Sequence, residues 1–374
     1  MSYKSRVTTI LGTRPELIRL SCILEKFDNV FQHRVIHTGQ NSDPQLSQVF
    51  ISELGIREPD EYLNIPKGSL GSFCSRLFID IEREFDLNPT DAVIILGDTN
   101  SALAGIIAKR RGIPVYHLEA GNRSFDANVP EEINRKIVDH FADYNLAYTH
   151  NAKENLLREG LHPQSLTVIG SPLNEVLCKY TSHINDSRIL EKIGVDSMNY
   201  FLVSAHRQEN IDQLIRIEEL IESLNWMSIE FKLPIVVSTH PRTNEKIHGS
   251  KLKLADKVQL HEPFGFFDYI KLQQNARVVL SDSGSVSEES AILGFPAITI
   301  RDSMERQEAL ESGTIIMAGI SKNGISEALN IVAKIPRTQS IPPDYQVTDT
   351  STRVVNFIAS TIHSHKFRNA IRKP

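Results

Sequence analysis

Carboxylate, arginine and asparagine side chains gather in residues 117–140, HLEAGNRSFDANVPEEINRKIVDH. The apolar run at 113–116 predicts a strand that delivers Glu119 into a turn offering Asn122, Arg123 and Asp126. Loops of this composition, set between a buried strand and a helix, are where α/β proteins place binding and catalytic groups. Glu119 is therefore a candidate for proton transfer.

A helix is expected to follow this turn. Pro130 suits its first turn, Asn128 is a plausible cap, and Glu131 and Glu132 suit the positive end of the helix dipole. Apolar side chains spaced four residues apart predict a core-facing stripe made of Ile133, Ile137 and Phe141. Glu131 and Arg135 are also four residues apart. They either form a solvated ion pair, worth about 0.3–0.5 kcal/mol, or belong to a chemical site at the helix start.

Two further turns follow predicted strands in the first half. Residues 6–11 (RVTTIL) predict a buried strand that leads into GTRPE (12–16) and an apolar-periodic helix. The amides at that helix start form a natural anion site, to which Arg14 and Arg19 add charge. The alternative is a plain turn with a solvated arginine. Residues 91–96 (DAVIIL) predict another strand, which runs into Asp98 of GDTN (97–100). Further strands of this half are predicted at 31–38, 144–148 and 166–169.

Strands that alternate with helices at this spacing predict a parallel sheet with helices on both faces. In such sheets ligands bind at the carboxyl ends of the strands. Since the turns carrying Arg14, Asp98 and Glu119 all follow strand ends, we expect them to share one edge. Together with Glu131, the carboxylates supply capacity for proton transfer, and Arg135 supplies a cationic partner for a leaving anion.

The second half repeats this plan. Strand-like runs at 200–204, 234–238, 258–260, 277–280 and 296–300 each end in a polar turn. Residues 281–289 (SDSGSVSEE) give the clearest ligand signal, because Ser283, Gly284 and Ser285 before a helix allow close backbone approach to a phosphate group. Glu289, one turn into that helix, could accept from sugar hydroxyls. The alternative is a serine-rich helix cap.

Basic and histidine side chains also follow strand ends in this half. Arg301 and Arg306 could add charge to a pyrophosphate, whereas His206 and His240 are singled out only by their position. The sequence has no G-x-G-x-x-G after a strand and no phosphate-binding G-x-x-x-x-G-K-[ST] motif. The histidines show no metal-ligand spacing, so no metal site is predicted.

Length and composition narrow the alternatives. The 374 residues suit two domains, which we place at 1–172, with a terminal helix within 351–374 packing back on it, and at 173–350. A net charge of −5 gives no support to a nucleic-acid or anionic membrane surface. Three scattered cysteines favour a reducing compartment. No apolar run approaches the ~18 residues of a membrane span and no signal peptide is evident, so a soluble cytoplasmic protein is expected.

The turns carry motifs that resemble those of the non-hydrolysing UDP-N-acetylglucosamine 2-epimerases. In chain order these are GTRPE (12–16), GDTNS (97–101), HLEAGNR (117–123), VPEEINR (129–135), AHRQEN (205–210), SDSGSVSEES (281–290) and RDSMER (301–306). The resemblance implies two Rossmann-like doubly wound domains around a cleft, the GT-B arrangement, in a homodimer. It also implies a reaction that needs no redox cofactor and no metal. The proton at sugar C2 leaves anti to UDP, a bound 2-acetamidoglycal forms, and UDP adds back while a proton reaches the other face of C2.

The resemblance also assigns roles by match to these motifs. The groups that transfer protons would be Asp98, Glu119 and Glu131. The groups that steady the departing diphosphate would be His206 and Arg135. The UDP-binding positions would be Arg14, Ser283, Gly284 and Arg306, with Glu289 at the ribose and Tyr269 stacked on uracil.

Three places differ from the commonest pattern of this family. Arg19 stands where that pattern has lysine, so the position holds a fixed cation that effectively cannot lose its proton. EAGNRSFD (119–126) replaces EAGLRTGD, and GQNSDPQ (39–45) lacks a His-Arg pair that takes part in binding a second, activating UDP-sugar. Arg19 and EAGNR resemble the branch that acts on UDP-2-acetamido-2,6-dideoxy-L-talose in capsule and O-antigen pathways. The alternatives are a hydrolysing relative, a GT-B glycosyltransferase and a UDP-sugar-binding regulator.

Overall fold

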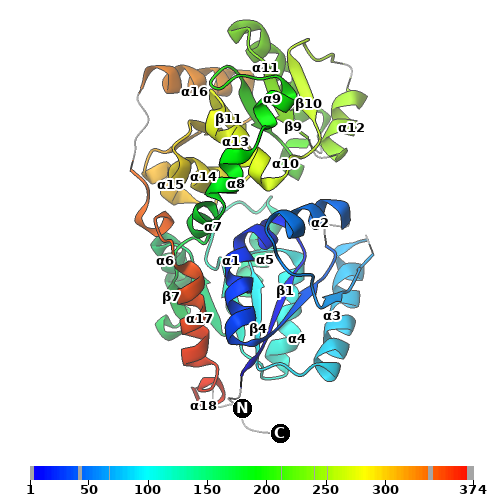
Figure 1. The fold of residues 1–374 in the computed structure, drawn as a ribbon, viewed down its shortest axis with the longest axis vertical. Coiled ribbons are helices and arrows are strands. Elements are labelled where there is room, and N and C mark those ends of the chain that lie inside the picture. The colour runs from blue at the N-terminus through cyan, green and yellow to red at the C-terminus, as the bar shows by residue number, and fades with distance from the viewer. Residues whose placement is uncertain are drawn as a thin grey trace. The chain divides into compact units, whose positions relative to one another are not determined.

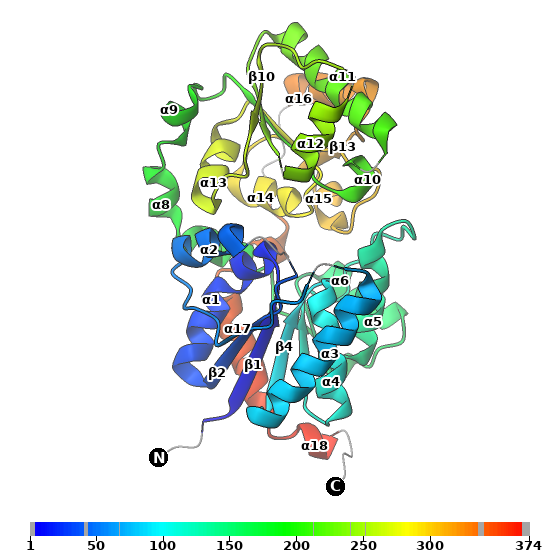
Figure 2. The same cartoon turned by 90° about the vertical axis from the view of Figure 1, so that its right-hand side faces the viewer.

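The computed structural model describes residues 4–40, 44–66, 68–211, 213–239, 241–250, 252–335 and 340–368. The chain divides into two compact units, Met1–Cys178 with Gln346–Pro374, and Lys179–Tyr345. Each unit is a parallel sheet with helices on both faces (Figure 1, Figure 2). The predicted α/β class with two doubly wound sheets is therefore confirmed. His240 and residues 41–43 of the GQNSDPQ segment lie outside the described residues.

The first unit contains, within its described residues, a seven-stranded sheet in the order β3-β2-β1-β4-β5-β6-β7. Its strands are β1 (Arg6–Leu11), β2 (Gln32–His37), β3 (Glu61–Tyr62), β4 (Ala92–Leu96), β5 (Val115–Leu118), β6 (Tyr144–Ala147) and β7 (Leu166–Val168). Its main helices are α1 (Arg14–Val30), α2 (Pro44–Glu53), α3 (Leu70–Leu87), α4 (Gly105–Arg110), α5 (Pro130–Phe141), α6 (His150–Arg158), α7 (Leu173–Lys179), α17 (Thr350–Thr361) and α18 (His365–Arg368).

Apolar side chains of β4 divide between the two faces of this sheet. Val93 and Ile95 pack with the apolar sides of α3, α4 and α5. α1 and α17 lie side by side on the other face (Figure 2), where the hydroxyls of Tyr116 and Thr361 hydrogen-bond at 2.8 Å. The last long helix of the chain therefore covers the sheet with which the chain begins.

The orientation of α5 differs from the prediction. The predicted apolar stripe is wrong for two of its three members, because Ile133 is 59% and Ile137 is 43% exposed, whereas Phe141 packs against the core. The buried face instead carries Glu132, Arg135, Val138 and Asp139. Two of these, Arg135 and Asp139, bind polar groups of the turns after β4 and β5, and those partners turn the helix away from its apolar stripe. The N-cap residue is Val129 rather than Asn128.

The second unit contains, within its described residues, a six-stranded sheet in the order β10-β9-β8-β11-β12-β13. Its strands are β8 (Phe201–Ser204), β9 (Ile235–Ser238), β10 (Val258–His261), β11 (Val278–Ser281), β12 (Ala297–Thr299) and β13 (Ile315–Met317). Its helices are α8 (Thr181–Asp186), α9 (Ile189–Ile193), α10 (Gln208–Ile211), α11 (Leu214–Phe231), α12 (Pro241–Gly249), α13 (Phe266–Asn275), α14 (Ser285–Leu293), α15 (Gln307–Glu311) and α16 (Lys322–Lys334).

Successive side chains of β8 point to opposite faces of the second sheet and show which helices cover each face. Phe201 and Val203 pack with α11 and α16, whereas Leu202 packs with α13 and α14 on the opposite face. Both faces of a central strand are therefore apolar, as expected for a parallel sheet. The predicted strands agree with those found to within two residues at each end, but β3 and β13 were not predicted because they are too short to show a pattern.

Both sheets reverse their strand order at one point, between β1 and β4 in the first unit and between β8 and β11 in the second. The turns at the carboxyl ends of such strand pairs are where open α/β sheets bind ligands. In the first unit these turns carry GTRPE and GDTN, and in the second they carry AHRQ and SDSG. Among the described residues, no helix combines the length and the apolar character of a membrane span.

Candidate active site

The turns of the first unit meet at one edge because β1, β4 and β5 are parallel neighbours. Arg14, Asp98 and Glu119 each follow one of these strands. Gly97, with a φ of +66°, is the first residue of the turn that carries Asp98. A Cβ placed on Gly97 would stand 3.9 Å from Glu119 Oε2, so the carboxylate of Glu119 lies close to the residue that precedes Asp98.

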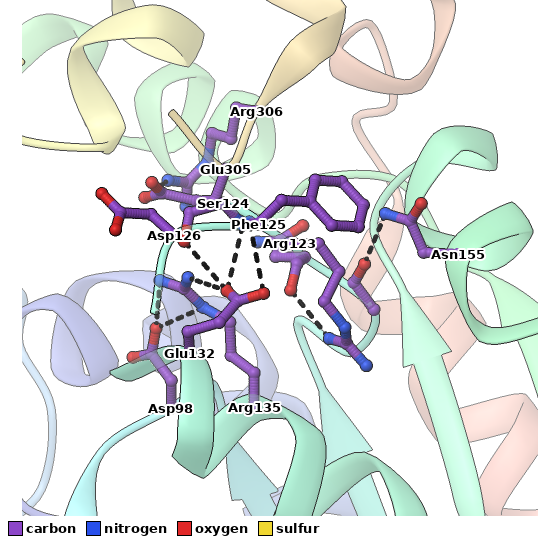
Figure 3. Close-up of polar contacts among 12 residues, drawn as sticks. Asp98, Arg123, Ser124, Phe125, Asp126, Glu132, Arg135, Asn155, Glu305 and Arg306 are labelled. Atoms are coloured by element: carbon purple, nitrogen blue, oxygen red, sulfur yellow. Dashed lines mark hydrogen bonds and ion pairs between the residues drawn. The ribbon is translucent and has the colours of Figure 1, made fainter. Parts of the chain in front are cut away.

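Asp98 is held by a buried arginine. Arg135 donates from Nε to Asp98 Oδ2 at 2.8 Å and from Nη1 to Glu132 Oε2 at 2.9 Å (Figure 3). Glu132 also accepts from the backbone amides of Ser124 at 3.0 Å and Phe125 at 3.3 Å. Burial alone would raise the pKa of Glu132, but the hydrogen bonds from Ser124 and the charge of Arg135 lower it below its usual value. Glu132 therefore fixes both the turn after β5 and the guanidinium that reaches Asp98.

The sequence indicates only a helix-dipole role for Glu132, whereas its neighbour Glu131 is also predicted to belong to the site. Glu131 is half-buried in the first turn of α5. Arg135 is only 4% exposed, so the solvated surface pair considered from the sequence is wrong. A glutamate three residues before an arginine in a helix start is the available signal for the observed pair.

Glu119 occupies a strained backbone position. Its φ of +63° lies in the left-handed region, which costs a non-glycine residue about 1–2 kcal/mol. Its carboxylate lies 3.5 Å from Nε of the buried Arg19 and accepts from Asn122 Nδ2 at 3.3 Å. Arg19 in turn stacks its guanidinium over the ring of Tyr148 at 5.6 Å. The strained turn and the fixed cation hold the Glu119 side chain beside Gly97.

Glu16 is a further carboxylate of this edge that the sequence reasoning missed. It accepts from the amide of Gly12 at 2.9 Å and from the hydroxyls of Thr13 at 2.7 Å and Thr99 at 3.2 Å. Burial raises the pKa of Glu16 to about 7, although these hydrogen bonds oppose the rise. The Thr13-x-x-Glu16 spacing is that of a capping box at the start of α1 and is the signal that could have revealed it.

The remaining predicted group of this edge is Arg14. It stands at the first position of α1, half-buried, with its guanidinium 5.8 Å from the centre of the Phe50 ring. Gly12, just before it, has no room for a Cβ, which would overlap the hydroxyls of Thr38 and Ser101. The packed turn after β1 therefore presents the α1 N-terminus at the strand ends.

In the second unit a buried aspartate organises the strand-end turns. Asp282 accepts from the backbone amides of His206 at 2.9 Å and Arg207 at 2.9 Å and from Asn210 Nδ2 at 3.1 Å. Burial would raise the pKa of Asp282, but the His206 charge and these hydrogen bonds lower it to about 2. His206 Nδ1 lies 3.1 Å from Asp282 Oδ1, and the His206 side chain is 45% exposed. Asp282 thus orients a ring that remains open to solvent.

The turn from β11 into α14 forms a compact cradle, defined here as Ser283, Gly284 and Ser285. The Ser283 and Ser285 hydroxyls lie 3.0 Å apart. A Cβ on Gly284 would overlap Glu305 Oε1 and Arg306 Nη1, so a larger residue would have to displace these two side chains. The cradle leads directly into the N-terminus of α14, where backbone amides suit a phosphate group.

Arg306 lies against this cradle and is buried between two carboxylates. Its Nη1 donates to Glu305 Oε1 at 3.1 Å and its Nε donates to Glu288 Oε1 at 2.5 Å. These contacts fix the guanidinium next to Gly284.

Tyr269 and Glu289, the predicted uracil and ribose positions, interact with one another, because the Glu289 charge acts on the Tyr269 hydroxyl. Burial, followed by the charge of Glu289, raises the pKa of Tyr269 above its usual value. Glu289 Oε2 accepts from Gln273 Nε2 at 2.6 Å. Both side chains are therefore held in place by the second unit itself. In the described part of the chain, no cluster of three or more histidine, cysteine, aspartate or glutamate residues has metal-binding geometry.

A family model and two solved structures that are similar to this chain all carry the name of one enzyme family. A family model described as UDP-N-acetylglucosamine 2-epimerase matches residues 25–359. The structure of UDP-N-acetylglucosamine 2-epimerase from Rickettsia bellii is 39% identical, covers 97% of this chain and 98% of that one, and superposes with a TM-score of 0.91. The Methanocaldococcus jannaschii UDP-GlcNAc 2-epimerase in complex with UDP-GlcNAc and UDP is 34% identical, with 95% and 99% coverage and a TM-score of 0.89.

A relative named for a different sugar is also similar. The UDP-2,3-diacetamido-2,3-dideoxy-D-glucuronate 2-epimerase of Pseudomonas aeruginosa is 32% identical over 361 residues, which is 95% of this chain and 99% of that protein. The similar proteins therefore differ in the sugar that their names give.

Proposed function

We propose, from the premise that this chain belongs to the UDP-N-acetylglucosamine 2-epimerase family, that it inverts C2 of a UDP-2-acetamido sugar without hydrolysing it. A carboxylate removes the C2 proton, the bond between C1 and the UDP oxygen breaks, and a 2-acetamidoglycal with a C1–C2 double bond remains. UDP then re-forms the bond to C1 while a proton is delivered to the opposite face of C2. Atoms and charge balance without any added reagent.

The observation that carries this proposal is the pair of carboxylates at one sheet edge. Asp98 and Glu119 come from adjacent strand ends, and each lies beside a buried arginine that keeps its position. Proton removal and return on two faces of one carbon require two such groups. Glu131, at the start of α5, is the third candidate for this role.

The second unit supplies the groups that we assign to UDP. The cradle and the α14 N-terminus suit the diphosphate, with Arg306 and His206 as its charged partners. Glu289 and Tyr269 are assigned to the ribose and the uracil. Arg14, Arg19 and Arg135 of the first unit complete the set of cations, and Arg135 steadies the departing diphosphate.

The test is NMR of the sugar in deuterated water. The wild-type protein should exchange the C2 proton for deuterium, while Asp98→Asn and Glu119→Gln each lose exchange by about 10²–10⁴-fold, the usual contribution of a general acid or base. UDP binding should remain, because neither substitution removes a group that we assign to UDP. The matched control is Glu154→Gln, which removes an exposed carboxylate of α6. Exchange at the wild-type rate in Asp98→Asn or in Glu119→Gln would contradict the assignment.

The same experiment identifies the sugar. Arg19 and the EAGNR turn favour UDP-2-acetamido-2,6-dideoxy-L-talose, converted to its L-fuco epimer for capsule or O-antigen synthesis, over UDP-N-acetylglucosamine. The Pseudomonas aeruginosa relative adds UDP-2,3-diacetamido-2,3-dideoxy-D-glucuronate as a third sugar to offer. Exchange in only one of the three identifies the substrate. Release of free sugar would instead identify a hydrolysing enzyme, and sugar binding with no exchange would identify a regulator or a transferase that waits for an acceptor.

We also propose a cytoplasmic homodimer. The exposed Ile133 and Ile137 form an apolar strip on α5 that a second copy could cover. Light scattering should give twice the mass of one chain, and Ile133→Asp should shift the protein towards monomer. A wild-type monomer at micromolar concentration would contradict this assembly.

A further inference from the structure

A cluster of charged side chains is buried behind the two carboxylate turns of the first unit, and no step above uses it. Its members are His117 on β5, Arg123 in the turn after β5, and Asp139 in the last turn of α5, all at most 1% exposed. Arg123 Nη1 donates to Asp139 Oδ2 at 2.7 Å and its Nη2 lies 2.6 Å from Glu159. Charges removed from water in this way are costly unless they are fully paired, so their contacts define what the cluster holds in place.

Both ring nitrogens of His117 face acceptors. Nε2 lies 2.8 Å from the carbonyl oxygen of Gly97, which can only accept, so Nε2 carries a proton. Nδ1 lies 2.9 Å from Asp139 Oδ1 and 3.3 Å from Asn145 Oδ1. The Asn145 amide cannot be reversed without loss, because its Nδ2 donates to the Asp139 carbonyl at 2.8 Å. The His117 ring therefore lies between the Asp139 carboxylate and the Gly97 carbonyl and contacts both.

The His117 ring connects the turn that carries Asp98 with the turn that carries Glu119. The paired register of β4 and β5 ends at Leu96 and Leu118, so the Gly97 carbonyl lies beyond the sheet ladder and takes its donor from His117. Gly97 directly precedes Asp98. Asp139 in turn accepts from the amide of Gly121 at 3.2 Å, two residues after Glu119.

We propose that His117 is a positioning residue for proton transfer, fixing the Gly97–Asp98 turn through the Gly97 carbonyl. The inference rests on the proposed function, since it assumes that Asp98 reacts with the sugar. Its physical basis is that a misplacement of a reacting group by about 1 Å costs on the order of 10²-fold in rate.

Two variants of one residue separate the two contacts. A glutamine amide reaches about as far as Nε2 of histidine, whereas an asparagine amide reaches only as far as Nδ1. His117→Gln should therefore keep the donor to Gly97 and stay within about 10-fold of the wild-type kcat for C2 deuterium exchange. His117→Asn should keep a donor to Asp139, lose the Gly97 contact, and lose about 100-fold in kcat with KM changed less than about 3-fold. Equal kcat in the two variants, or a loss confined to KM, would overturn the proposal.

A spectroscopic measurement decides the matter even if His117→Asn does not fold. In wild-type protein labelled with ¹⁵N-histidine, one histidine should show a proton on Nε2 that exchanges slowly with solvent, and this signal should be absent in His117→Gln. A His117 ring without a proton on Nε2 would overturn the assignment. Full exchange activity in Asp98→Asn would instead contradict the proposed function and leave the His117 signals unaffected, so the two failures are distinguishable.

Discussion

Each unit places one fully buried carboxylate between the two turns where its sheet reverses strand order. Glu16 in the first unit accepts from Thr13 in its own turn and from Thr99 in the turn after β4. Asp282 in the second unit stands in the turn after β11 and accepts from His206 in the turn after β8. The two carboxylates therefore perform the same task, although Glu16 follows β1, the first strand of its pair, and Asp282 follows β11, the second strand of its pair.

The pKa values of the two carboxylates nevertheless shift in opposite directions. Burial raises the pKa of Glu16 to about 7, whereas the His206 charge and the surrounding hydrogen bonds outweigh burial and lower the pKa of Asp282 to about 2. Glu16 accepts from two hydroxyls and from the backbone amides of Gly12 and Thr13, all of them neutral. Asp282 accepts from two backbone amides and an amide side chain and also faces His206. The difference shows that the partners, not the depth of burial, decide whether a buried carboxylate is charged.

The largest effect is expected from removing the Asp282 carboxylate, which joins the turns after β8 and β11. Asp282→Ala should destabilise the second unit by about 3–5 kcal/mol, because three buried N–H donors lose their acceptor at once. It should also weaken UDP binding, since the His206 turn is no longer held. Chemical denaturation and calorimetric UDP binding measure the two effects. Asp302→Ala, which removes an exposed carboxylate of the same unit, is the control and should cost less than about 1 kcal/mol.

The pH dependence of the Asp282 contribution follows from its lowered pKa. The stabilisation is present above pH 3.8, the ordinary value, and is lost as the pH falls towards 2. Wild-type and Asp282→Ala proteins should therefore become more alike in stability on acidification. A gap that stays constant down to pH 2.5 would contradict the assigned charge.

The contribution of Glu16 to stability should depend on pH in the opposite sense. Because the pKa of Glu16 is raised from 4.5 to about 7, its stabilising contribution is complete below pH 4.5 and is lost as the pH rises to about 7. The loss amounts to about 3 kcal/mol at 1.36 kcal/mol per pKa unit. Glu16→Gln cannot ionise and can keep its contacts, with its oxygen facing Gly12 and its amide donating to Thr99.

Denaturation midpoints at pH 5 and pH 8 test this prediction. Relative to Glu16→Gln, the wild-type protein should lose stability between the two values, and the exposed variant Glu154→Gln should follow the wild type. A wild-type protein that gains stability relative to Glu16→Gln between pH 5 and pH 8 would mean that the hydroxyls stabilise the charged carboxylate more than burial opposes it.

The sequence predicted the strands and the edge of the sheet on which the polar turns lie, because both follow from local apolar runs and from the geometry of parallel sheets. It did not predict the buried face of α5. Local periodicity favoured Ile133 and Ile137, but the side chains that turn the helix inward, Arg135 and Asp139, bind groups remote in sequence. Asp282 was missed for the same reason, since its partners lie in the turn after β8. Such long-range pairing leaves no periodic trace along the chain. Glu16 and Glu132 did leave local signals, a capping-box spacing with Thr13 and a three-residue spacing to Arg135.

The smallest expected effect comes from the single hydrogen bond that joins the two turns of the first unit. Thr99→Val preserves shape and removes the hydroxyl that donates to Glu16 Oε1 at 3.2 Å, so it should cost about 1 kcal/mol. Thr13→Val removes a hydroxyl from the same carboxylate but within one turn, and should cost a similar amount. Thr99 directly follows Asp98, so only Thr99→Val should also slow C2 exchange, by about threefold to tenfold at 1.4 kcal/mol per factor of ten. Equal exchange rates in the two variants would mean that Glu16 stabilises its own turn and does not help to place Asp98.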